Sequence, residues 1–481
     1  MAGEKLVGAI PDGWEYTTLG AACVNGGGDI QTGPFGSQLH AADYVPVGIP
    51  SIMPQNIGDN RISETGIARI APDDAKRLSR YLVREGDIVY SRRGDVERRA
   101  LIRANEDGWL CGTGCLRVRL GAQGVDPRYA AYYLGHPSVR EWIVRHAHGA
   151  TMPNLNTSIL SACPFVVPPE SDQRAIAHIL GTLDDKIELN RRRNQTLEAM
   201  ARALFQDWFV DFGPVRARME GRARQDGARS GQPRTPQASD LPWPGAEAGA
   251  GTQGEPYLPA HLWQLFPERL DDEGKPEGWE MQPLSELLTI IGGGTPKTSV
   301  EEYWGGDIPW FSVVDTPSAS DVFVVATEKT ITTQGLAGSS ARLITKGTTI
   351  ISARGTVGNL AIAGREMTFN QSCYGLRGTG SAGDYFVYLA AQQMVDQLKS
   401  MAHGSVFSTI TRQTFEAIQR PVPPPAVLTE FESLVSGWFD AILSSVEESR
   451  TLAQLRDTLL PKLIAGELRI ADAEKFMERV A

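Results

Sequence analysis

The chain contains an internal duplication, and this repeat limits its fold more than any other feature. Pro11-Asp12-Gly13-Trp14-Glu15 returns 265 residues later as Pro276-Glu277-Gly278-Trp279-Glu280. Leu82 to Ile102 resembles Leu343 to Ala363 at an offset of 261. At an offset of 255, Tyr133, Gly149 and Pro168-Pro169 recur as Tyr388, Gly404 and Pro423-Pro424. Offsets that shrink while the order is preserved indicate a duplication followed by small deletions.

Each copy has the same internal plan of short β-branched runs with glycine-rich turns, a proline-rich exit and a long helix. In the first copy, Asp87 to Tyr90 and Leu116 to Leu120 have strand character, and Pro127 to Ala147 is predicted to be one helix. The exits end at Pro169 and Pro425, because proline cannot continue into the interior of the following helix. The pattern predicts an α+β protein with two similar mixed α/β lobes.

A heptad pattern follows each exit. Apolar residues recur at spacings of four and three, the signature of a helix with one apolar seam. A helix of about 39 residues is roughly 58 Å long, so we expect two rods that pair with each other as an antiparallel coiled coil. The seam residues are Ile176, Leu180, Leu183, Ile187, Leu197 and Leu204 in the first helix, and Val435, Trp438, Ile442, Leu452 and Leu459 in the second.

Both seams become polar at the same two places, Asn190 and Asn194 in the first helix and Ser445 and Ser449 in the second. Polar seam residues reduce stability but fix the alignment of the paired helices. We therefore expect a single antiparallel register. Two similar lobes separated by such rods would be related by a pseudo-two-fold axis.

The sequence predicts five segments: a first lobe at 1–168, a long helix at 169–212, a linker at 213–275, a second lobe at 276–422, and a second helix with tail at 423–481. The linker is rich in glycine, proline and arginine. We interpret it as a solvated connector, with a basic tether along DNA phosphates as the alternative. An apolar patch from Tyr257 to Phe266 is expected to dock on a lobe. The linker arginines are Arg216, Arg218, Arg222, Arg224, Arg229 and Arg234.

Composition narrows the class of protein. The 481 residues carry a formal net charge of −10, which by itself counts against nucleic-acid binding, so local basic patches must be sought instead. An odd number of cysteines, five in a long chain, argues against a disulfide framework, and Cys111 and Cys115 have no second pair to complete a zinc site. No apolar stretch approaches about 18 residues. We expect a cytoplasmic protein without a membrane segment or a bound metal.

Catalytic motifs are absent. Neither Pro-Pro pair has the Asn or Asp and the aromatic residue of an amino-methyltransferase loop, and the chain has no G-x-x-x-x-G-K-[ST] phosphate loop. Gly378 to Gly383 formally matches G-x-G-x-x-G, but the first copy lacks the glycine pattern, so we interpret it as a strand-to-helix turn. These observations favour a non-catalytic protein.

Two loop types in each copy could read DNA. One places arginine at a turn after a strand, where a guanidinium can bind a phosphate or a guanine edge, and the other is a polar loop that begins with glycine. The alternatives are surface arginines paired with carboxylates, and ordinary helix caps. The candidates in the first copy are Arg92, Arg93, Arg98, Arg99, Thr151, Asn154 and Asn156. Those in the second are Arg354, Thr356, Ser405, Ser408, Thr409, Thr411 and Arg412.

The repeat, the arginine-glycine loops, the polar loops and the proline-rich exits together resemble the specificity subunit of type I restriction-modification enzymes, over nearly the full length. The resemblance implies two target-recognition domains that each read one half of a bipartite, asymmetric site in double-stranded DNA. It also implies long helices that dock two methyltransferase subunits, with restriction or translocase subunits as further partners. S-adenosylmethionine, ATP and magnesium would belong to those partners. The insert at 213–254 departs from the resemblance.

Three other interpretations remain open from the residues alone. The repeats could form a scaffold that binds only proteins, which would suit the negative charge. The chain could serve a modification complex that has no nuclease partner. It could also be an enzyme with an active site that the motifs do not reveal.

Overall fold

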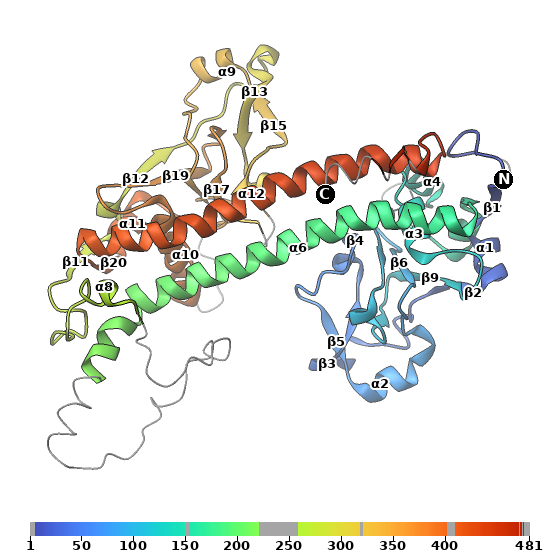
Figure 1. Cartoon of the computed structure of the whole chain (residues 1–481), viewed down its shortest axis with the longest axis horizontal. Coiled ribbons are helices and arrows are strands. Elements are labelled where there is room, and N and C mark those ends of the chain that lie inside the picture. Colours follow the sequence, from blue (N-terminus) through green and yellow to red (C-terminus); the bar gives the residue numbers. More distant parts are fainter. Residues whose placement is uncertain are drawn as a thin grey trace. The chain divides into compact units, whose positions relative to one another are not determined.

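The computed structural model describes residues 5–149, 153–220, 258–317, 321–401, 409–470, 472, 473 and 475. The chain forms two compact units (Figure 1). The first unit comprises Met1–Ile187 and Arg450–Ala481, and the second comprises Glu188–Ser449. Each long helix contributes one part of its length to each unit.

The first unit contains a five-stranded sheet, a three-stranded sheet and a two-stranded ribbon. Neighbouring strands are antiparallel except for two parallel pairs, Asp59–Asn60 with Arg99–Leu101 and Tyr44–Ile52 with Leu110–Cys111. The five-stranded sheet has the order β2 (Gly27–Thr32), β9 (Cys115–Gly121), β6 (Ile88–Ser91), β7 (Arg99–Leu101) and β4 (Asp59–Asn60). The three-stranded sheet has the order β5 (Ala68–Ile70), β3 (Tyr44–Ile52) and β8 (Leu110–Cys111). The ribbon pairs β1 (Glu15–Thr18) with β10 (Pro164–Val167).

The second unit repeats this topology strand for strand, including the two parallel pairs. Its five-stranded sheet has the order β12 (Leu288–Gly292), β19 (Cys373–Gly378), β16 (Thr349–Ser352), β17 (Leu360–Ala363) and β14 (Phe323–Val324). Its three-stranded sheet has the order β15 (Lys329–Ile331), β13 (Trp304–Phe311) and β18 (Thr368–Phe369). Its ribbon pairs β11 (Glu280–Pro283) with β20 (Gln419–Val422). The duplication predicted from weak sequence landmarks is therefore confirmed, and with it the α+β fold class.

The prediction of one continuous helix over residues 127–147 is wrong. The first unit has two helices there, α3 (Pro127–Tyr133) and α4 (Pro137–His146). Pro137 cannot donate the hydrogen bond that would continue α3. In addition, a Cβ on Gly135 would lie 1.8 Å from Nη2 of Arg99, so the chain bends around that side chain. The first unit also contains α1 (Leu19–Gly26), α2 (Pro72–Arg77) and α5 (Thr157–Ala162). The second unit contains the short helices α8 (Ala260–Trp263), α9 (Thr333–Ala337) and α11 (Arg412–Ala417), and the longer α10 (Asp384–Met401).

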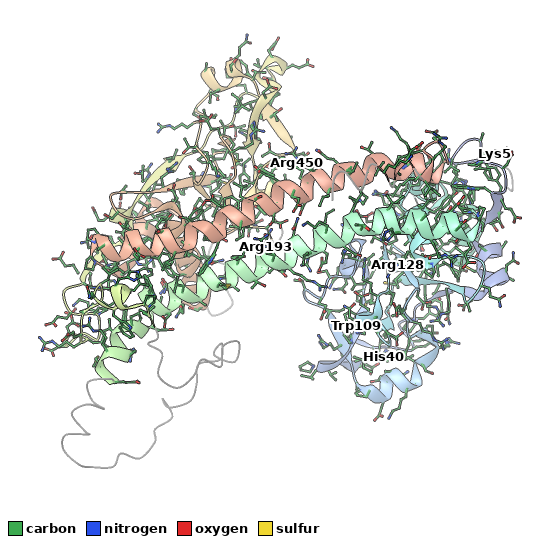
Figure 2. The ribbon with its side chains drawn as sticks, viewed as in Figure 1. Lys5, His40, Trp109, Arg128, Arg193 and Arg450 are labelled. Carbon is green, nitrogen blue, oxygen red and sulfur yellow. The ribbon has the colours of Figure 1, made fainter. Side chains whose placement is uncertain are left out.

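Both rods form as expected, α6 at Glu170–Phe209 and α12 at Pro425–Ile464, with 40 residues each (Figure 1). Their seam residues are buried or half-buried in the cores of the two units. Polar side chains occupy the outer faces, where Arg193 in the second unit and Arg450 in the first are exposed (Figure 2). The amphipathic pattern read from the sequence is confirmed.

The polar seam positions meet inside the second unit. Nδ2 of the buried Asn190 donates to Oε2 of Glu448 at 2.7 Å and to Oγ of Ser449 at 3.2 Å. Farther along α6, the ring of Phe205 lies 6.0 Å from that of Phe431 on α12. Because residue numbers rise along one helix and fall along the other, the two helices pair antiparallel in this unit, as predicted.

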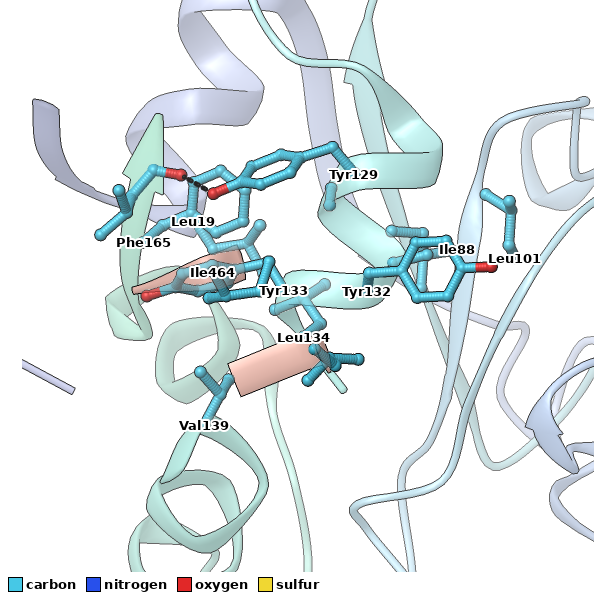
Figure 3. Close-up of a cluster of buried hydrophobic side chains, with 14 of the residues drawn as sticks. Leu19, Ile88, Leu101, Tyr129, Tyr132, Tyr133, Leu134, Val139, Phe165 and Ile464 are labelled. Atoms are coloured by element: carbon cyan, nitrogen blue, oxygen red, sulfur yellow. Dashed lines mark hydrogen bonds between the residues drawn. The ribbon is translucent and has the colours of Figure 1, made fainter. Parts of the chain in front are cut away.

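The end of α12 completes the core of the first unit. Ile464 is fully buried in the same cluster as Leu19, Tyr133 and Phe165 (Figure 3). The hydroxyl of Tyr129 donates to the carbonyl of Val166 at 2.9 Å, which satisfies a polar group that would otherwise be buried without a partner. The first unit therefore depends on a segment from the far end of the chain.

The apolar patch at the end of the linker docks as predicted. Leu258, Leu262 and Phe266 are buried in the core of the second unit, and the Phe266 ring lies 5.0 Å from that of Trp208. Residues 213–220 are helical. There Arg218 binds the carbonyl oxygens of Trp263 and Phe266, so this linker arginine supports the fold. Arg222, Arg224, Arg229 and Arg234 lie outside the described residues.

Asp207 near the end of α6 makes the stability of the second unit depend on pH. Burial, with a contribution from Asp211, raises the pKa of Asp207 from 3.8 to about 6. An acid whose pKa is higher in the folded state binds its proton more tightly when folded, so stability rises as pH falls from above 6 towards 4. We expect Asp207→Asn to remove this part of the pH dependence. Urea unfolding of both proteins between pH 7.5 and 5 checks it, and equal slopes would refute it.

Candidate nucleic-acid interface

The arginine-glycine turns occupy equivalent places in the two units. Each follows the central strand of the five-stranded sheet, β6 in the first unit and β16 in the second. Gly94 and Gly355 have φ of 74° and 78°, a left-handed conformation that favours glycine. Each turn therefore presents its preceding residue, Arg93 or Arg354, at the surface, where both side chains are exposed.

The arginine-glycine turn and the polar loop meet in each unit. The amide of Leu155 donates to the carbonyl of Arg92 at 2.8 Å, and the amide of Ile410 donates to that of Ala353 at 3.0 Å. Leu155 and Ile410 are buried and correspond to one another in the repeat. In the first unit Arg93 and Asn154 also form a β-bridge. Two loops that the sequence suggested separately thus form one surface, twice.

The arginines of these two surfaces differ in whether their guanidinium groups already have partners within the protein. Within the described residues, the guanidinium groups of Arg93 and Arg354 have no hydrogen-bond or ion-pair partner, so they are available to an anion. Arg98 instead forms an ion pair with Asp95, with 2.5 Å between Nε and Oδ2. Arg92 is half-buried and its guanidinium lies over the Phe35 ring, 5.8 Å from the centroid. Thr356 is exposed beside Arg354.

Several candidates have structural roles instead. Arg99 is 5% exposed and its Nε donates to the carbonyl of Ala131 at 2.8 Å, so the prediction that it contacts DNA is wrong and its role is structural. Asn156 caps α5 by accepting from the amide of Ile159 at 2.8 Å, as the alternative interpretation held.

The second polar loop is partly structural as well. Thr411 is the N-cap residue of α11, and its amide donates to Oγ1 of Thr414 at 3.0 Å. Thr409 is exposed but its hydroxyl donates to the carbonyl of Ala353, and Arg412 donates to the carbonyl of Ile290. These contacts hold the loop against the sheet. Thr151, Ser405 and Ser408 lie outside the described residues.

Sequence reasoning missed one feature of the first surface. The loop Gly33-Pro34-Phe35-Gly36 lies beside Arg92, and Phe35 is 53% exposed. Arg92 and Gly33 are both hydrogen-bonded to the turn that enters β9, at the carbonyls of Gly114 and Cys115. The available signal was the run Gly33-Pro34-Phe35-Gly36 itself, because glycine and proline are typical of turns and this run places an aromatic residue among them.

The remaining chemical motifs belong to the fold. Gly378 to Gly383 joins β19 to α10, and the amide of Gly378 donates to Oδ1 of Asp384 at 3.1 Å, which confirms a strand-to-helix turn. Burial raises the pKa of the Cys111 thiol to about 12, and the neighbouring Cys115 donates to the carbonyl of Ile52. Within the described ranges no three metal-ligating residues gather. No described helix has the length and apolarity needed to cross a bilayer.

Known proteins share this organisation. Residues 29–199 and 276–427 match the family model described as the type I restriction modification DNA specificity domain. The chain is 29% identical to the type I restriction enzyme HindI specificity subunit of Haemophilus influenzae, covering 87% of this chain and 95% of that protein. It is 30% identical to the MjaIX specificity subunit of Methanocaldococcus jannaschii, over 41% and 46% of the two chains. The fold resembles the S subunit of a type I restriction-modification system from M. genitalium, with a TM-score of 0.51, 16% identity, and coverage of 96% and 98%.

Proposed function

Because the chain belongs to the type I restriction-modification specificity family, we propose that its two units each read one half of a bipartite DNA site. The observation that supports this most directly is the repeated surface. In each unit an exposed arginine without a described partner stands at a glycine turn that is hydrogen-bonded to a polar loop. Exposed guanidinium groups bind phosphates and guanine edges, which suits DNA better than a protein-only scaffold.

The site should be asymmetric. The two units share their topology but differ in the side chains of the candidate interface, where Arg92 and Asn154 correspond to the buried Ala353 and to Thr409. An amide side chain and a hydroxyl offer different hydrogen bonds to base edges, so the half-sites they select should differ in sequence. A palindromic site would require equivalent side chains in both units.

The chain supplies recognition, and its partners supply the chemistry. We propose that α6 and α12 dock two methyltransferase subunits, and that restriction or translocase subunits join the complex. S-adenosylmethionine, ATP and magnesium are then bound by those subunits in the cytoplasm. The negative net charge is compatible with this arrangement, since most of the surface would face proteins.

The test is the methylation pattern of DNA from cells that carry the chain with its methyltransferase partner. Replacing residues 149–156 with Gly/Ser should change or abolish recognition of one half of a split motif, and replacing 404–411 should do so for the other half. Co-purification of the partner shows that assembly is intact. Methylation that persists unchanged when the whole chain is deleted would exclude the proposal and favour a protein scaffold.

A further inference from the structure

The first unit has an exposed aromatic residue at its candidate interface that the second unit lacks. The two units can be matched at Gly33 and Gly293, where an added Cβ would lie 2.1 Å from the carbonyl oxygens of Gly112 and Asn370 respectively. Two residues later stand Phe35 in the first unit and Thr295 in the second. Thr295 is hydrogen-bonded to Gln371, whereas Phe35 is 53% exposed.

Phe35 is held in place by its neighbours. The Arg92 guanidinium lies over its ring, within the range of a cation–π contact, and the backbone of Arg92 is hydrogen-bonded to both Gly114 and Leu155. The corresponding residue of the second unit is Ala353, which makes the same two backbone bonds, to Ser372 and Ile410, without such a side chain. The two units thus share these backbone hydrogen bonds, and the first unit adds the pair of Phe35 and Arg92 side chains.

Unsatisfied polar atoms accompany this pair. Among the described residues, Nε of Arg92 and Oδ1 of Asn154 are buried without a hydrogen-bond partner. Such atoms are rare because a buried donor or acceptor without a partner costs free energy. Asn154 lies next to Leu155, which is bonded to Arg92. The ring of Phe35 is therefore exposed beside Arg92, whose buried Nε has no hydrogen-bond partner among the described residues.

We propose that Phe35 determines specificity in the first unit by contacting the C5-methyl group of a thymine. This proposal rests on the proposed function. The thymine methyl is the apolar group that base edges display in the major groove, and phenylalanine is suited to contact it. The half-site of the first unit then contains an A·T pair for which the second unit has no equivalent contact.

The experiment uses the full chain assembled with its methyltransferase partner and duplexes that carry the methylated motif. Each thymine of the half-site read by the first unit is replaced in turn by deoxyuridine, which pairs identically and lacks only the methyl group. At one position we expect about fourfold weaker binding by the wild-type protein, the value of one buried methyl-sized group. Phe35→Ala should bind the thymine and deoxyuridine duplexes equally.

Val47→Ala is the matched control, because Val47 is an apolar residue of the same unit that is 87% exposed. It should retain the wild-type preference for thymine. The proposal is overturned if the half-site has no A·T pair, if no deoxyuridine weakens wild-type binding, or if Phe35→Ala keeps the preference. A wild-type complex without any site-specific binding would instead refute the proposed function.

Discussion

Replacing Arg93 by alanine is expected to weaken binding to the cognate site by roughly 1 to 3 kcal/mol and to relax base preference in one half-site only. Arg93 is exposed at the Gly94 turn without a described partner, so its removal takes away a contact to DNA without breaking one inside the protein. Arg354→Ala should have the same effect on the other half-site. Equilibrium binding to duplexes with single base changes in each half measures both effects.

Arg98→Ala is the control for this pair of substitutions. It removes the same charge from the same unit, but Arg98 is already paired with Asp95, so the loss of affinity should be smaller. If a guanidinium contacts only phosphate, its removal should weaken binding to all DNA sequences equally. It should also reduce the salt dependence of binding by about one counterion. If Arg93→Ala and Arg354→Ala affect the same half-site, the assignment of one unit to each half is wrong.

Arg456→Met is expected to destabilise the first unit by about 3 to 5 kcal/mol. Nη1 of Arg456 on α12 lies 2.7 Å from Oδ1 of Asp184 on α6, and these side chains are 18% and 9% exposed. The hydroxyl of Tyr132 donates to the other oxygen of Asp184 at 2.7 Å. Without Arg456, a largely buried carboxylate would lose its cation, which costs far more than the net value of an exposed pair. Urea unfolding of wild type and variant measures the loss.

Two comparisons separate this effect from a general loss of charge. Arg174 pairs with Glu170 on the exposed side of α6, so Arg174→Met should cost at most about 1 kcal/mol. Adding Asp184→Asn to Arg456→Met should recover part of the stability, because the buried charge is then absent. Equal losses for Arg456→Met and Arg174→Met would show that the buried pair contributes no more than a surface pair.

The candidate interface could be predicted only in part. Glycine after Arg93 and Arg354 predicted tight turns with exposed arginines, because the conformation of a turn depends on a few neighbouring residues. Arg98 and Arg99 are adjacent, and the sequence alone could not show that their environments differ. Arg98 is paired with Asp95, whereas Arg99 is buried against Ala131. Burial depends on which element packs above a strand, and here that element is the α3 segment, about 30 residues away in sequence.

The sequence by itself determined the duplication, the fold class and the antiparallel helix pairing, since periodic apolar positions and repeated landmarks are properties of the chain. Only the tertiary structure decided that each arginine-glycine turn joins a polar loop, that Phe35 stands beside Arg92, and that Arg456 meets Asp184. These contacts join residues up to 272 positions apart. Such partners are selected by the packing of whole elements, which local sequence patterns do not record.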